Sequence, residues 1–516
     1  GVDRAIVCIR SNSSHKGLAE IRRTETWNLL RLSGMRKTGE DFAAKFALFC
    51  RRICYTTGVY GKPSERNTTH ANEKYESDAE RIDLSQGGGG GTPAPWLTLR
   101  WSLLFGLLSV GAWRSAAVPE IPADGVRLSQ RPGTSQAIVE YELQNEDAIV
   151  TLDICTNGVS IGYENIRHLV GDVNRLVHPG STRRIKWNVH KSWPGRLLTD
   201  GGVTAVVTAW ATNCPPDYLV ADLSGATTVC YYPAAEAVPG GVTNDLYKTE
   251  KLLMRKIPAA NALFRRGSPA KEVGRDGGNY ERAHLVSHTN DYWMGVYPVT
   301  QAQYRRVSGT LSGVFTNDAE SATYPLNGVS ILMLRGSNLE TTKKRLPTVA
   351  QDSLVGCFRQ VVPSLPLDIP TDAQWEYACR AGSYAALYNG RDLVDSTSGE
   401  NLDAIAWHAG NSEGRPHAVG ERQPNAFGLY DMLGNVREAT FDLYYPFGAA
   451  PQCDPFEPWS DGQNMRASYR GGSFADTAAG CRSAKRYGEF DWNRPSRTSP
   501  ESEQARCGVR LMALIP

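Results

Sequence analysis

Two glycine-containing runs constrain this chain more than any other feature: NAFGLYDMLGNVRE at 425–438 and RGGSF at 470–474. In the first run, Asp431 and Glu438 flank a Gly-Asn turn that can aim backbone carbonyls inward. In the second, two glycines let the backbone approach a neighbour closely or adopt a positive φ. Both runs are too specific for generic loop chemistry. With 50 glycines and 29 prolines in the chain, they indicate a loop-rich protein.

The same half of the chain contains two predicted helix starts. In VTQAQ at 299–303, Thr300 is placed to cap a helix and Gln303 to complete a capping box. We expect that helix to reach about 307 and to end before Gly309. In PTDAQ at 370–374, Thr371 and Gln374 repeat the device, and the predicted helix runs to about 380.

Together with PTDAQWEYACRAG at 370–382 and CGVR at 507–510, these runs resemble the formylglycine-generating enzyme (sulfatase-modifying factor) family. The resemblance covers roughly 264–514. It implies an α+β domain of C-type-lectin-like fold for 264–516, which hydrophobic periodicity alone would not predict. The family contains a copper-dependent oxidase, which converts a peptidyl cysteine of sulfatases to formylglycine, and many non-catalytic relatives.

The resemblance also implies where an oxidase would keep its cysteines. The catalytic branch places them three and eight residues after the serine that corresponds to Ser473, which gives Asp476 and Cys481 in this chain. Copper(I) bound by two thiolates needs two soft sulfur ligands, and aspartate is a hard oxygen ligand. Ser473 and Cys481 are thus candidate catalytic residues of an incomplete pair. Candidates for a second sulfur are Cys379, Cys453 and Cys507.

Cys481 also has a structural interpretation, as a buried cysteine or as the disulfide partner of Cys507. An iron-dependent relative that oxidises small-molecule thiols has less support, because the accompanying helical domain of such proteins is not visible in this sequence.

A calcium site is the second implication of the resemblance. In the family, the positions of Asp431 and Glu438 bind calcium through side chains, and those of Gly434 and Val436 through backbone oxygens. This mix of carboxylate and carbonyl oxygens suits a hard cation. The alternative is a metal-free turn in which the two carboxylates accept backbone N–H bonds. Tryptophans that usually follow in the family are replaced here by Arg437 and Ala439.

The preceding segment, 118–235, is predicted to be an all-β, immunoglobulin-like sandwich. Short β-branched runs separated by turn residues lie at 137–143, 149–156, 183–189, 203–211, 218–222 and 227–232. We see no catalytic constellation in it and expect a spacer or adhesion module. Cys155, Cys214 and Cys230 lie on or beside these runs, so one pair is a disulfide candidate. The connector, 236–263, includes a strand predicted at 251–257.

The first 117 residues are not predicted to form a domain. Residues 1–94 lack sustained hydrophobic periodicity and resemble a leader. In 95–117, Arg100 precedes the apolar stretch WSLLFGLLSVGA and small residues follow, which is typical of a signal peptide. The apolar core is too short for a stable membrane span, and a buried helix or strand is the alternative. We therefore expect a secreted, periplasmic or cell-surface protein.

Charge and surface composition limit the partners. A net charge of +2 gives no electrostatic case for nucleic acid. The stretch 476–503 contains arginines and a lysine interleaved with aromatics, a composition suited to binding an acidic glycan or a protein; an ordinary solvated loop is the equal alternative. The sequence thus predicts a calcium-stabilised, non-catalytic binding module, with the copper oxidase as the alternative.

Overall fold

The computed structural model describes residues 118–130, 133–196, 198, 202–226, 228–310, 321–336, 349–456, 466–489 and 503–515. The predicted leader at 1–94 and the signal-peptide-like segment at 95–117 lie outside these ranges. Within them, no helix combines the length and the apolar character that a bilayer crossing requires.

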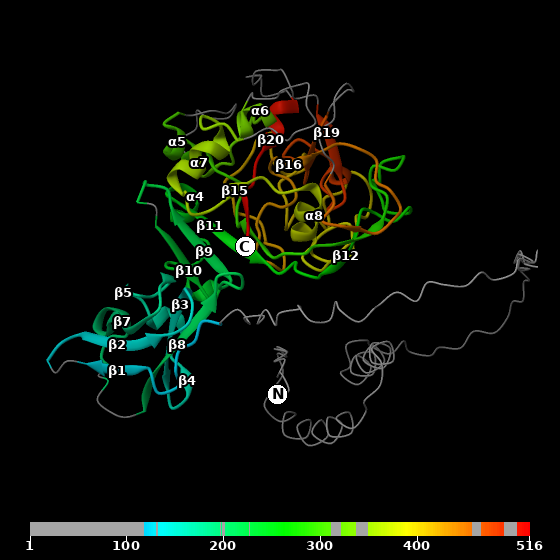
Figure 1. Ribbon diagram of the computed structural model, residues 1–516. Helices are drawn as coiled ribbons and strands as arrows, with labels where there is room; N and C mark the ends of the chain where they lie inside the picture. Colours follow the sequence, from blue (N-terminus) through cyan, green and yellow to red (C-terminus); the bar gives the residue numbers. More distant parts are fainter. Residues whose placement is uncertain are drawn as a thin grey trace, which may run out of the picture. The chain divides into compact units, whose positions relative to one another are not determined.

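The first part of the described chain consists of two β-sheets around one apolar core (Figure 1). One sheet has the order β1-β2-β7-β5; in the other, β4, β6 and β8 all pair with β3. Burial alternates strictly along β2, as expected for a strand with one face on a core. The strands are β1 (Arg127–Gln130), β2 (Gln136–Leu143), β3 (Ala148–Thr156), β4 (Val159–Ser160), β5 (Leu169–Gly171), β6 (Arg175–Val177), β7 (Gly180–Asn188) and β8 (Val203–Ala211), with a short helix, α3 (Val189–Ser192).

Two strands predicted for this sandwich belong elsewhere. β9 (Tyr218–Asp222) and β10 (Val229–Tyr232) lie in a six-stranded sheet of order β10-β9-β11-β14-β21-β15. The reason is visible in β9, which is buried on both faces. Leu219 packs into one apolar cluster, whereas Tyr218 packs into another. A strand buried on both faces needs a sheet that is covered on both sides. The strand expected at 251–257 is confirmed as β11, the neighbour of β9 and β14.

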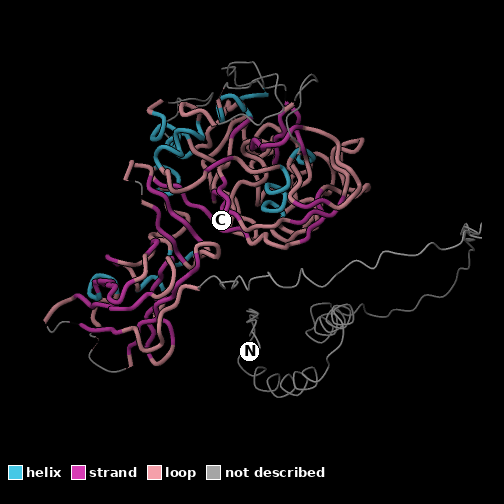
Figure 2. Tube along the Cα trace, in the orientation of Figure 1, coloured by secondary structure: helices cyan, strands magenta, loops and turns pink. Residues whose placement is uncertain are grey.

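Two further sheets complete the second part, with orders β19-β18-β16-β20 and β12-β13-β17. Figure 2 shows that loops and turns make up much of this part. Its strands are β11 (Lys251–Ile257), β12 (Leu263–Arg266), β13 (His284–Ser287), β14 (Tyr292–Gly295), β15 (Leu367–Asp368), β16 (Arg437–Leu443), β17 (Gln452–Cys453), β18 (Ala467–Arg470), β19 (Arg486–Glu489), β20 (Cys507–Gly508) and β21 (Met512–Leu514). Its helices are α4 (Leu246–Thr249), α5 (Gln301–Ser308), α6 (Ile331–Arg335), α7 (Leu354–Val361) and α8 (Asp372–Arg380).

Both predicted capping boxes are confirmed. Thr300 with Gln303 begins α5, and Thr371 with Gln374 begins α8, each with both reciprocal hydrogen bonds. α5 ends at Gly309, which is left-handed with φ 73°. The sequence did not predict α7, whose N-cap serine has glycine at the third position and so offers no capping-box signal.

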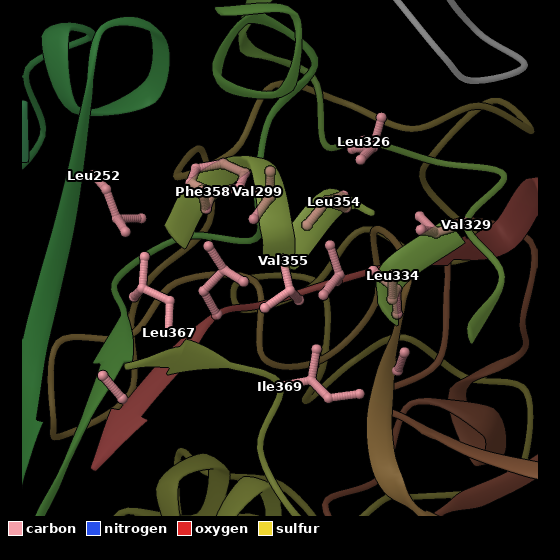
Figure 3. Packing of buried hydrophobic residues seen from close by; sticks show 14 of the residues in the cluster. Leu252, Val299, Leu326, Val329, Leu334, Leu354, Val355, Phe358, Leu367 and Ile369 are labelled. Atoms are coloured by element: carbon pink, nitrogen blue, oxygen red, sulfur yellow. The ribbon is translucent and has the colours of Figure 1, made fainter. Parts of the chain in front are cut away.

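The largest apolar cluster joins α7 to the six-stranded sheet (Figure 3). Phe358 and Leu354 from α7, Leu252 from β11 and Leu367 from β15 are all buried in it. Truncating a fully buried phenylalanine to alanine typically costs about 3–5 kcal/mol. This packing holds the six-stranded sheet in place. Its strand β21 follows the CGVR run at 507–510, so the sheet also positions that run.

Candidate functional site

The RGGSF run forms a tight turn directly after β18. Gly471 and Gly472 are both left-handed, with φ of 88° and 75°. A Cβ on Gly472 would lie 2.6 Å from the carbonyl oxygen of Gly480 and 2.7 Å from Sγ of Cys481. The second glycine is therefore required both by its dihedral angles and by a close backbone approach, as the sequence predicted. The turn delivers Ser473 into a fully buried position.

Ser473 and Asp476 form the start of a buried polar network. The Ser473 hydroxyl donates to Oδ2 of Asp476 at 2.6 Å. The Arg437 guanidinium, at the start of β16, donates to both oxygens of the same carboxylate, at 2.9 and 2.6 Å. Arg437 also donates to Glu503 at 2.7 Å and stacks over the Tyr487 ring at 3.7 Å. Both predicted positions, the serine and the aspartate, are thus engaged by protein groups.

The electrostatics make this an ion pair rather than a neutral contact. Burial opposes the charge on Asp476, but the hydrogen bonds and positive charge of Arg437 outweigh it and lower the pKa of Asp476. Burial likewise opposes the charge on Arg437, and Asp476 nevertheless raises the pKa of Arg437. Both groups are therefore charged at neutral pH, with side-chain exposures of only 4% and 9%.

Cys481 is a buried free thiol beside this pair. Its Sγ lies 3.9 Å from the carbonyl oxygen of Ser473, and burial raises the pKa of the thiol well above its usual value. The Cys481–Cys507 disulfide left open by the sequence is not formed. Cys155 on β3, Cys214 after β8 and Cys230 on β10 are also free thiols, so no pair among them is bridged.

The three candidates for a second sulfur lie in different surroundings. Cys379 shares an apolar cluster with Cys481, and burial raises its pKa to about 12. Cys453 is exposed on β17, in a different sheet. Cys507 is the β20 register partner of Arg437, and its thiol contacts the carbonyl oxygen of Glu503 at 3.5 Å.

The residues at this position do not fit a two-thiolate copper(I) site. Cys481 supplies one sulfur, and the position at which the resemblance implies the other holds Asp476, a hard oxygen ligand paired with Arg437. Across the described ranges, no three histidine, cysteine, aspartate or glutamate side chains are grouped as a metal site would need.

The predicted calcium loop is also tightly built. Gly434 is left-handed, and a Cβ on it would lie 2.2 Å from the carbonyl oxygen of Trp407. The Asp431 side chain accepts a hydrogen bond from the Gly420 N–H at 2.7 Å and lies 3.5 Å from the Asn435 amide. Burial raises the pKa of Asp431 to about 6, although the Gly420 bond and the charge of Arg510 oppose the shift. The Asp431 carboxylate is therefore already engaged by protein donors.

Glu438, the second predicted calcium carboxylate, is paired with Arg510. The guanidinium donates to both carboxylate oxygens at 2.6–3.0 Å, and the indole of Trp375 donates to Oε2 at 2.6 Å. Arg510 also donates to backbone carbonyls, including those of Gly295 and Tyr430. A calcium ion binding through Glu438, Asp431, Gly434 and Val436 would have to compete with this buried guanidinium.

The basic surface predicted for 476–503 is wrong in its described part. Arg482 and Arg486 are buried, with exposures of 0% and 1%. Arg482 pairs with Glu281 at 2.8 Å and Arg486 with Asp372 at 2.8 Å. Their alternation with aromatics reflects an interior ion-pair network, not a ligand surface. The predicted residues beyond Glu489 lie outside the described ranges.

Sequence reasoning missed the partners of its own candidates. Arg437 was noted as a departure from the family's tryptophan, and Arg510 as part of a motif, but neither was given a role. Two departures from the pattern that the resemblance implies could have predicted this pair: Asp476 stands where a cysteine is expected, and Arg437 stands where a tryptophan is expected. Opposite charges that are buried in one site have to pair, because an unpaired buried charge is strongly destabilising.

Comparison with known proteins finds a family match for the C-terminal half of the chain. Residues 260–513 match the sulfatase-modifying factor enzyme 1-like domain. The chain is 26% identical over 257 residues to the serine/threonine-protein kinase Pkn1 of Chlamydia trachomatis, covering 48% of this chain and 37% of that protein. It is 36% identical over 89 residues to the formylglycine-generating enzyme of Mycobacterium tuberculosis, covering 15% and 28%.

A solved structure, Treponema denticola variable protein 1, aligns over 52% of this chain and 96% of its own at 21% identity and a TM-score of 0.39. The chain spans little more than a third of the kinase relative (37%) and less than a third of the mycobacterial enzyme (28%). The C-terminal half of this chain, residues 260–513, belongs to the formylglycine-generating enzyme, or sulfatase-modifying factor, family.

Proposed function

We propose that the C-terminal domain is a non-catalytic binding module of a secreted protein. The observation that supports this most is the Arg437–Asp476 ion pair. It occupies the position at which the resemblance implies the first catalytic cysteine, and it is held by three hydrogen bonds counting that from Ser473. Copper(I) chemistry at two thiolates has no counterpart in a carboxylate bound to a guanidinium.

Similarity to named proteins supports the same proposal. A protein kinase, a chaperone named LppX and formylglycine-generating enzymes are all similar to this chain. The names of these relatives therefore do not tie the domain to oxidase chemistry. The ligand class we propose is a protein or a glycan, and secretion rests on the signal-like segment at 95–117.

The sandwich is proposed to be an immunoglobulin-like spacer. Its sheet order β1-β2-β7-β5 follows the A-B-E-D order of such domains, and the β3–β8 pair opposite follows C and F. Calcium at Asp431, Gly434, Val436 and Glu438 stays a proposal, with the condition that the ion displaces Arg510 from Glu438.

The proposal is tested by an oxidase assay on the full chain. The protein is treated with copper(I) and incubated under oxygen with a cysteine-containing sulfatase-motif peptide, and mass spectrometry follows conversion of cysteine to formylglycine. We expect no conversion while a catalytic family member converts the peptide in parallel. Conversion that disappears in Cys481→Ser would overturn the proposal and establish the copper-dependent oxidase.

A further inference from the structure

Within the described ranges, strand β8 is paired along one edge only. It pairs with β3 along all nine residues, Val203–Ala211, and no other strand in the described part of the chain pairs with it. A seven-stranded sandwich of this type would place a further strand beside it. Here the next strand in the chain, β9, pairs with β10 and β11 instead.

The apolar core is correspondingly open beside β8. Ala205 and Val207 point to the core side, opposite Ile154 and Leu152 of β3. The two β3 residues are 0% and 3% exposed, whereas both β8 residues are only half-buried. Partners in one cross-strand pair share a face, so the difference arises because no described segment covers the core along this edge.

The sequence of β8 does nothing to protect this edge. VTAVVTAWA contains no charge and no proline, two of the devices that usually keep edge strands from pairing. On the outer face Val206 is 46% exposed. A long, uncharged edge rich in β-branched residues is suited to accept another strand.

We propose that β8 pairs with β8 of a second copy of this chain. An antiparallel register centred on Val207 uses all nine residues of both strands. It sets Val206 against Thr208 of the partner on the outer face, and Ala205 against Ala209 of the partner on the core side. Each such pair joins small or β-branched residues, and no charge is left opposite a like charge. The contact is two-fold symmetric and closes on itself, so it yields a dimer rather than a filament.

Analytical ultracentrifugation of the full chain measures its oligomeric state and so tests the proposal. Variants that introduce like charges at Val206 and Thr208 on the outer face serve as the perturbation. We expect the wild type to dimerise at concentrations up to about 100 μM, where a micromolar contact is saturated. In Val206→Lys/Thr208→Lys, two lysine pairs oppose each other across the axis, and dimerisation should weaken at least about tenfold. Dimerisation of Val206→Glu/Thr208→Glu should weaken by the same factor, because two glutamate pairs then oppose each other. Mixing the two variants should restore dimers, because every lysine then meets a glutamate.

Restoration on mixing also shows that both variants are folded. Val170→Lys on β5, an edge valine of the other sheet that is more exposed than Val206 (67% against 46%), is the control and should dimerise as the wild type does. A monomeric wild type at about 100 μM would overturn the proposal, as would a lysine variant that still dimerises. If β8 amides of a monomer are protected from hydrogen exchange, another segment covers the edge, and the proposal is equally wrong.

Discussion

Replacing Arg437 with methionine tests the buried ion pair of the candidate site. The substitution keeps the apolar length of the side chain and removes the two hydrogen bonds to Asp476. The carboxylate would retain the Ser473 hydroxyl at 2.6 Å and, at 3.8 Å, the guanidinium of Arg506. Neither replaces a bidentate guanidinium, so a charge would be left largely uncompensated in the interior.

The expected magnitude follows from burial. Removing one partner of a buried pair costs about 3–5 kcal/mol, because the remaining charge stays desolvated. The bond from Arg437 to Glu503 adds little, because Glu503 is 56% exposed and surface pairs contribute about 0–1 kcal/mol. Arg437→Met/Asp476→Leu should recover most of the loss, since an apolar pair of similar volume leaves no buried charge.

The effect should depend on pH with a defined sign. The pKa of Asp476 is lowered in the folded protein, so its contribution is present above the unfolded pKa, near 3.8, and is lost as the pH falls through the folded value. The difference between wild type and Arg437→Met should therefore be largest near neutral pH and should shrink in acid.

Urea unfolding followed by tryptophan fluorescence measures these free energies. Arg306→Met is the matched control, because its pair with Glu250 is exposed and 3.9 Å long; it should cost no more than about 1 kcal/mol. An Arg437→Met loss as small as that of the control, or a loss that is independent of pH, would refute the reasoning.

Three further predictions concern the surrounding loops. Gly472→Ala should cost about 3 kcal/mol, against about 1 kcal/mol for Gly390→Ala, because both are left-handed but only Gly472 has atoms at contact distance; equal melting temperatures would contradict this. The pKa of Asp431 is raised to about 6, so its stability contribution is full below 3.8 and lost as the pH rises through 6. Asp431→Asn should remove that slope and be more stable at neutral pH by roughly 3 kcal/mol in urea titrations; an unchanged slope would refute it. Finally, calcium should raise the melting temperature of Arg510→Met more than that of the wild type, because Glu438 is then released; equal shifts would show that the guanidinium does not compete with calcium.

Local sequence rules predicted where two helices begin, whereas the sheet that a strand joins depends on tertiary contacts. The capping boxes at Thr300 and Thr371 depend on residues three apart, so the sequence contains the whole device. β9 has the composition of a sandwich strand, yet its burial on both faces is determined by residues far away in the chain, Leu252 and Trp293 among them. Strand partners of that kind cannot be read from a local pattern.

The site was predicted at its positions but not in its chemistry. Ser473, Asp431 and Glu438 lie in the two runs singled out by their glycines, Cys481 follows the second run, and all four residues are buried. The guanidinium that each loop needs comes from β16 in one case and from the chain's last segment in the other. Local sequence spacing identifies neither arginine, because Arg437 is 39 positions from Asp476 and Arg510 is 72 positions from Glu438.

Copper(I) affinity tests the central claim that the Arg437–Asp476 pair replaces a metal site. The wild type is compared with Arg437→Trp/Asp476→Cys in competition with a coloured copper(I) chelator. We expect no stoichiometric binding by the wild type. The variant, in which a second thiol faces Cys481 without the guanidinium, should bind at least about tenfold more tightly, since two soft ligands are then present. Tight, Cys481-dependent binding by the wild type would contradict the account.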